Sequence, residues 1–106
     1  MPACALLIRH KTRPGRRDDV RRVWEEHLAP AIASNPDHTA YVYCFDDADP
    51  DALVAFQQYT SREASAAFLR TDAYAAYLRA VEPLLAGPPT VSALTPIWSK
   101  PGLSSR

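Results

Sequence analysis

The sequence is poor in cysteine and carries no net charge, and each of these features argues against a class of protein. Only two cysteines occur, Cys4 and Cys44, and neither belongs to a CxxC pair or to a Cys/His spacing typical of a metal site. Both lie in apolar stretches, so we predict buried free thiols in a reducing compartment. Twelve basic residues balance twelve acidic ones. That balance argues against a nucleic-acid-binding protein dominated by phosphate contacts.

Long apolar runs are also missing. No segment is long and apolar enough to cross a membrane, and the start of the chain has no basic stretch followed by an apolar core and a cleavage site. These features predict a cytoplasmic protein with no membrane partner. Abundant alanine, and arginine in preference to lysine, suggest a bacterial, GC-rich genome.

What is present suits one compact domain. The 106 residues are 47% hydrophobic, enough for a core of limited stability. We therefore predict a single domain over residues 1–106, with a loose tail at 99–106. The absence of an internal repeat argues against a solenoid.

Hydrophobic periodicity divides the chain into four strands and three helical stretches. Ser61 and Asp72 are the expected N-caps of the second and third helical stretches, and Pro30 should kink the first. We expect strands at 3–10, 39–46, 52–60 and 90–98, and helices at 16–34, 61–71 and 72–85. This β–α–β–β–α–β order predicts an α+β, ferredoxin-like fold, a four-stranded antiparallel sheet with helices on one face.

The predicted strands are apolar at nearly every position rather than at alternate positions, most clearly over 4–8, 40–45 and 52–56. A strand that is apolar on both sides needs cover on both sides, and the helices can cover only one. We therefore predict a two-fold homodimer formed through the free face of the sheet.

Several local patterns, taken in order, resemble one known family. The turn "KTRPG" follows the first strand, "AYVYCFDDADPDALVAF" forms the central hairpin, and "QQYTSREASAAFLRTDAYAAYLRAV" runs from strand to helices. In this order and spacing, from residue 4 to about residue 98, the chain resembles the antibiotic biosynthesis monooxygenase family of dimeric α/β-barrel proteins, which includes quinol monooxygenases.

The resemblance is incomplete at the family's polar positions. The usual glutamate falls on Gln57, the following aromatic on Tyr59, and the two helical histidines on Phe68 and Ala73, whereas the intervening Ser/Thr is kept as Thr71. Haem-degrading relatives use the first histidine as iron ligand. Since a phenylalanine cannot ligate iron or carry a proton, the sequence predicts neither haem binding in that mode nor chemistry that relies on these histidines.

The activity that the resemblance implies is oxidation of a small phenolic, quinol or polyketide-like substrate by dioxygen, with no cofactor and no metal. Such chemistry needs an apolar pocket, a base near neutral pKa and a donor facing the developing negative charge. Two alternatives remain open on the same scaffold: a non-oxidative isomerase or cyclase, and a small-molecule binding protein without turnover.

Histidines and aromatic side chains are the candidate site residues. His10 ends one face of the first strand, and His27 lies on the apolar stripe of the first helix; each is a candidate base. His38, at the entrance to the second strand, is a third imidazole. The residues expected to line a pocket for an aromatic molecule are Trp24, Gln57, Tyr59, Phe68, Tyr74 and Tyr77. The alternative is that the histidines are structural and the aromatic residues are core.

Overall fold

The structure is a computed structural model, and it describes residues 3–101. Residues 102–106, part of the predicted tail, lie outside the described residues. The strands are β1 (Cys4–Lys11), β2 (His38–Phe45), β3 (Ala52–Tyr59) and β4 (Thr90–Leu94). The helices are α1 (Arg17–His27), α2 (Ala29–Ser34), α3 (Arg62–Phe68) and α4 (Asp72–Val81), followed by a short 3-10 turn, η1 (Glu82–Leu84). No helix among the described residues is long and apolar enough to span a membrane.

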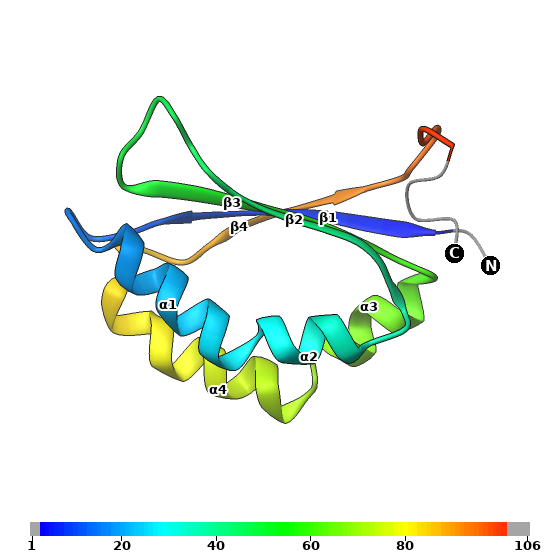
Figure 1. Cartoon of the computed structure of the whole chain (residues 1–106), viewed down its shortest axis with the longest axis horizontal. Coiled ribbons are helices and arrows are strands. Elements are labelled where there is room, and N and C mark those ends of the chain that lie inside the picture. Colours follow the sequence, from blue (N-terminus) through cyan, green and yellow to red (C-terminus); the bar gives the residue numbers. More distant parts are fainter. Residues whose placement is uncertain (1–2, 102–106) are drawn as a thin grey trace.

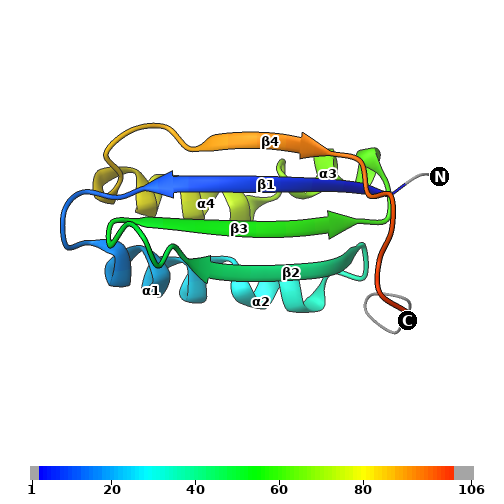
Figure 2. The ribbon, with the colours of Figure 1, turned by 90° about the horizontal axis from the view of Figure 1, so that it is seen from above.

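The four strands form one antiparallel sheet in the order β2-β3-β1-β4. All helices lie on one side of it, as Figure 1 shows edge-on. Figure 2 looks onto the other side, where no helix covers the strands. The ferredoxin-like fold predicted from the sequence is confirmed.

Helix boundaries follow local capping. The predicted first helix is split into α1 and α2 at Leu28, two residues before Pro30, because proline disrupts a helix interior. Ser61 caps α3 as predicted, its Oγ accepting from the backbone N–H of Ala64 at 3.0 Å. The predicted cap of α4 was wrong by one residue. The side chain of Thr71, rather than Asp72, accepts from the Tyr74 N–H at 3.2 Å.

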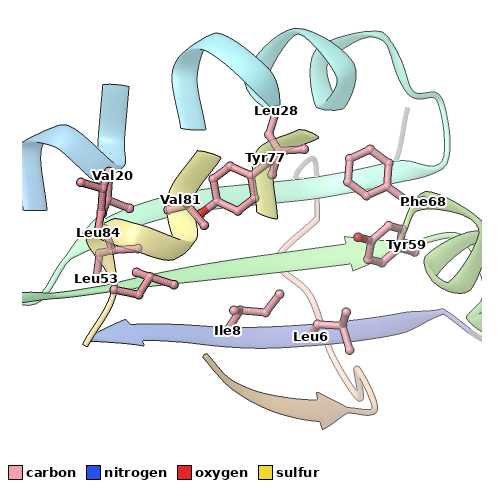
Figure 3. Close-up of a cluster of buried hydrophobic side chains, with 11 residues drawn as sticks. Leu6, Ile8, Val20, Leu28, Leu53, Tyr59, Phe68, Tyr77, Val81 and Leu84 are labelled. Atoms are coloured by element: carbon pink, nitrogen blue, oxygen red, sulfur yellow. The ribbon is translucent and has the colours of Figure 1, made fainter. Parts of the chain in front are cut away.

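The core fills the space between the helices and the sheet (Figure 3). Residues at alternate positions point into it, such as Leu6 and Ile8 on β1 and Leu53 on β3. The helices contribute Val20, Phe68, Tyr77 and Val81, and Leu28 joins them from between α1 and α2. On the short helix α3, Ala64 and Phe68 lie toward the core, whereas Ala67 is exposed.

The opposite face of the sheet, here called the open face, carries apolar side chains that no helix covers. Paired positions place Leu7, Phe56 and Val42 in one row across β1, β3 and β2. Val42 is 53% exposed. Cys44 follows on the same face, so the prediction that both thiols are buried was wrong for Cys44, although Cys4 is buried.

The last strand is shorter than predicted. β4 ends at Leu94 rather than at residue 98, since Pro96 has no N–H to continue the ladder. Ile97 and Trp98 beyond it are largely exposed. Figure 2 shows this segment turning away from β4 and passing the ends of the other strands toward β2.

Arg17 on α1 binds the acidic loop, residues 46–51, between β2 and β3. Its Nη1 donates to the backbone carbonyls of Asp46, Asp49 and Ala52 at 2.9, 3.0 and 3.1 Å. The guanidinium carbon lies 4.0 Å from the centre of the Phe45 ring. These contacts of Arg17 hold the loop against α1.

Candidate functional site

A narrow cavity lies between the sheet and the helices, in the middle of the helix-covered face. Aromatic side chains form most of its wall, with two polar residues among them. The lining residues are Ile8, His10, Trp24, Leu28, Tyr41, Tyr43, Ala55, Gln57, Phe68, Tyr74 and Tyr77. Its volume is about 20 Å³, room for roughly one water molecule. Five of the six predicted pocket-lining residues lie on this wall.

His10 is the only imidazole on that wall among the described residues. It is 6% exposed, near the end of β1, and its Nε2 lies 3.1 Å from the Tyr77 hydroxyl oxygen on α4. The other ring nitrogen, Nδ1, is buried and has no hydrogen-bond partner within residues 3–101. Burial lowers the His10 pKa from 6.5 to about 4 and raises the Tyr77 pKa. Both groups are therefore neutral at neutral pH.

Gln57 and Tyr59 form a second buried polar pair. They are two residues apart on β3 and so point to the same face. The Tyr59 hydroxyl donates to Gln57 Oε1 at 2.5 Å. Gln57 lines the cavity, but Tyr59, fully buried behind it, does not. Tyr59 thus orients the amide that lines the cavity.

The aromatic side chains of the cavity wall contact one another directly. The Trp24 ring stacks on Tyr43, with centroids 4.1 Å apart and planes 16° apart. Its indole Nε1 donates to the Tyr41 hydroxyl at 3.2 Å. Burial raises the Tyr41 pKa to about 12, so this phenol stays protonated. Trp24, Tyr41 and Tyr74 are only partly buried, so the cavity wall extends toward the surface at these residues.

Phe68 lines two hollows. It belongs to the wall of the inner cavity, and it also borders a groove of about 270 Å³ between α2 and α3. Other residues of that groove include Asn35, Asp37 and Thr71. Phe68 therefore lies between the cavity and this groove.

The structure does not bring His27 to the cavity. His27 is the last residue of α1 and is half-buried. The cavity lining includes Trp24 and Leu28 from this region but not His27. Arg70 and Arg79, both exposed, are also absent from the lining. Arg79 instead borders an open groove at the other end of α4, together with Arg13.

His38 lies closer to this region than its place in the sequence indicates. Its ring centroid is 4.4 Å from that of Tyr59 and 4.6 Å from that of Phe68, which it meets edge-on. A register shift between His38 and Ala40 breaks the alternation of β2. Such a bulge redirects a side chain to the other face, and the sequence carries no clear signal for it. Burial lowers the His38 pKa, and nearby Asp37 partly opposes this.

Across residues 3–101, no three His, Cys, Asp or Glu side chains are grouped so that they could hold a metal ion. The ring of Phe68 cannot supply a donor atom to a metal. The polar groups available to a ligand in the cavity are the His10 imidazole, the Gln57 amide and the tyrosine hydroxyls.

Comparison with known proteins gives a family and a fold. The family model described as antibiotic biosynthesis monooxygenase matches residues 4–80. A structure from Chloroflexus aurantiacus, assigned to the same family, has a TM-score of 0.79 at 24% identity, covering 95% of this chain and 98% of the other. A Mycobacterium tuberculosis protein has a TM-score of 0.79 at 27% identity, covering 92% and 97%. A Nitrosomonas europaea protein, also so assigned, reaches 0.84 at 14% identity, covering 91% of each chain. No protein of curated function matches the sequence.

Proposed function

Because the chain belongs to the antibiotic biosynthesis monooxygenase family, we propose that it is a cofactor-independent monooxygenase. Its substrate is a small phenolic, quinol or polyketide-like molecule, and its oxidant is dioxygen. The observation that carries this proposal is the cavity itself, an aromatic-walled space with one neutral, buried imidazole on its wall. An apolar pocket with few polar groups suits an aromatic ring and a single reacting oxygen.

The reaction balances without an outside reductant. One atom of dioxygen is inserted at a ring carbon, which becomes a carbonyl, and the other atom leaves as water with two hydrogens from the substrate. The substrate therefore supplies all four electrons. The protein's task is to hold the ring, exclude water and stabilise the negative charge that develops on the substrate oxygen when a proton is lost.

The closed cavity is too small for such a substrate, so binding must open it. A volume of about 20 Å³ takes roughly one water molecule and no ring. Trp24, Tyr41 and Tyr74 are partly exposed and can turn outward. Phe68 is the other candidate for displacement, because moving it would join the cavity to the groove between α2 and α3. The proposal therefore includes an induced opening on substrate binding.

Oxygen uptake tests the proposed activity. Metal-free and flavin-free protein is mixed with a panel of quinols and anthrone-like phenols in an oxygen electrode. We expect uptake by the wild-type protein and a loss of about tenfold or more in His10→Ala, in line with removal of one polar group that acts in the transition state. His27→Ala is the matched control, since His27 is absent from the lining, and it should retain activity.

Each alternative predicts a different result in the same experiment. Solvent deuterium entering the substrate without oxygen uptake would indicate an isomerase or cyclase. A ligand that binds and is recovered unchanged would indicate a binding protein. Absence of uptake across the whole panel would remove the monooxygenase proposal.

The second part of the proposal is a homodimer formed through the open face. The support is the row of Leu7, Phe56 and Val42, which is apolar and uncovered in a single chain. Two such faces packed together would bury a continuous apolar surface on the sheet side opposite the cavity. Each chain carries its own cavity between helices and sheet, so a dimer of this kind would hold two separate sites.

A further inference from the structure

A second hollow, wider than the inner cavity, lies where the chain leaves α4 and turns toward β4 (Figure 1). Its volume is about 570 Å³, against about 20 Å³ for the inner cavity. Small-molecule sites are commonly about 300–1,000 Å³, so this hollow can take a ring as it stands. We call it the α4-end groove. Its charged lining residues are Arg13, Arg79 and Glu82, and its apolar ones include Leu78, Val81 and Leu85.

The segment that follows α4 is fixed to the end of β1 by backbone hydrogen bonds. The Arg13 N–H donates to the Leu84 carbonyl at 2.9 Å, and the Ala86 N–H donates to the Lys11 carbonyl at 2.8 Å. The two prolines at 88–89, also on the lining, have φ angles restricted by their rings. The α4-end groove is therefore formed before a ligand arrives, and binding orders little additional backbone.

Two guanidinium groups on the groove have no carboxylate partner within residues 3–101. Arg79, in the last turn of α4, also makes no side-chain hydrogen bond in that part of the chain. Arg13 Nε donates to the Pro83 carbonyl at 2.9 Å, which directs its guanidinium and leaves both Nη groups for a ligand. Glu82 lines the groove too, but its carboxylate pairs with neither arginine. Positive groups thus outnumber negative groups by two to one.

Apolar side chains form the part of the groove between these charges. Leu78 is 38% exposed, whereas Val81 and Leu85, which line the same groove, are buried. An apolar ring seated there would remove the exposed part of Leu78 from water, which is favourable. Guanidinium groups beside an apolar surface are complementary to a ligand that joins an anionic head to an apolar body. The planar guanidinium suits a carboxylate in particular, because its N–H donors can bind both oxygens.

We propose that the α4-end groove binds a small aromatic carboxylic acid, with its carboxylate at Arg79 and Arg13 and its ring against Leu78. The volume suits one small molecule of this kind. The groove shares no lining residue with the inner cavity, so it is a separate binding site. Its occupation does not depend on the proposed monooxygenase activity.

A matched pair of ligands tests the role of charge. 2-Naphthoate and 2-naphthalenemethanol share a two-ring body, and only the first carries a negative charge at neutral pH. Titration calorimetry with the full-length protein at low salt should show the acid binding about tenfold or more tighter, because charge-assisted hydrogen bonds are stronger than neutral ones. Added salt should reduce this preference. Equal affinity for the two ligands, or no binding of the acid, would overturn the proposal.

Single charge changes locate the effect. Arg79→Gln should reduce the preference for the acid to about threefold or less, because one of two guanidinium groups is lost. Arg70→Gln is the matched control, since Arg70 is exposed and absent from the lining, and it should keep the preference. Glu82→Gln removes the opposing carboxylate and should tighten binding of the acid but not of the alcohol. An unchanged melting temperature shows that each variant is folded. Equal losses in Arg70→Gln and Arg79→Gln would indicate unspecific attraction and overturn the site.

Backbone amide NMR shows which hollow the acid occupies. Adding 2-naphthoate should shift the signals of Leu78, Leu85 and Gly87, which line the α4-end groove, and leave those of Ala55 and Gln57 in the inner cavity unchanged. Shifts confined to the inner cavity would overturn the proposal, even if oxygen uptake is observed with other substrates. Shifts in the groove together with absence of oxygen uptake would support this site and reject the monooxygenase.

Discussion

The two faces of the sheet are made from the same strands but have opposite properties. On β3, Leu53, Ala55 and Gln57 face the helices and are buried, whereas Val54 and Phe56 point to the open face and are partly exposed. The helix-covered face of the sheet contains buried polar side chains, His10 and Gln57. The open face contains apolar groups without cover. Chemistry is therefore expected on the covered face, and association on the open one.

The sharpest comparison of the two faces is between neighbours on β3. Leu53 is fully buried and Val54 is not. We expect Leu53→Ala to lower the free energy of unfolding by about 2–5 kcal/mol, because it leaves a cavity in the core. Val54→Ala should cost about 1 kcal/mol or less in dilute protein. Urea unfolding measures both, and equal costs would mean that the open face is covered as tightly as the helical one.

The buried imidazole makes the covered face sensitive to acid. The His10 pKa is lowered from 6.5 to about 4 by burial, so between these values the unfolded chain binds a proton that the folded chain does not. The contribution of His10 to the free energy of unfolding is therefore fully present above about pH 6.5, and it is lost as the pH falls toward 4. The loss is roughly 3 kcal/mol, at about 1.4 kcal/mol per pKa unit. Urea unfolding at a series of pH values should show this loss in the wild-type protein and much less in His10→Asn.

Other groups act in the same direction and must be separated from His10. The His38 pKa is also lowered by burial, so His38→Asn is the control and should remove a smaller part of the slope. The pKa values of Asp46 and Asp49 are lowered, first by the backbone N–H of Ala48 and by Lys11 respectively. The contribution of these two carboxylates to stability is lost only at lower pH, when the pH falls through their depressed pKa values. If the dependence of stability on pH were unchanged in His10→Asn, the loss of stability in acid could not be assigned to His10.

Association should depend on the open face alone. Val42→Asp places a charge in the middle of the apolar row, and we expect it to weaken the dimer at least about tenfold, because the charge would be desolvated in the interface. Leu69→Asp is a matched control, since Leu69 is an exposed apolar residue just after α3 on the other side of the sheet. Sedimentation velocity over a range of protein concentrations gives the dimer dissociation constant of each variant. A monomeric wild-type protein, or an equal effect of the two changes, would contradict the predicted interface.

The two faces also differ in how much the sequence predicted of them. The apolar runs predicted the strands β1, β2 and β3, because strand composition is a local property. The order of strands and helices then predicted that helices cover only one face of the sheet. The prediction that Cys44 is buried was wrong for a related reason. An apolar neighbourhood in sequence does not show which face of the sheet a residue takes, or whether that face is covered in a single chain.

The cavity was harder to predict from the sequence. Shared strand parity placed Gln57 with Tyr59, but the contact between His10 and Tyr77 joins residues 67 positions apart, a packing detail that no local pattern contains. The place of His38 depends on the break in register at the start of β2. Helical spacing placed His27 with Trp24, whereas the end of α1 at His27 leaves it half-buried and outside the cavity wall.

The reactivity of the two cysteines also distinguishes the two faces of the sheet. This test is expected to perturb the protein least. Cys4 is buried, whereas Cys44 is exposed on the open face, two residues from Val42. A thiol reagent should modify Cys44 and leave Cys4 unmodified in the folded chain, because access limits the reaction. Since the dimer would cover Cys44, its rate should fall as protein concentration rises and should recover in Val42→Asp; Cys44→Ser identifies the signal. A rate independent of concentration in a protein that does dimerise would place the interface elsewhere, and the apolar row would then need another explanation.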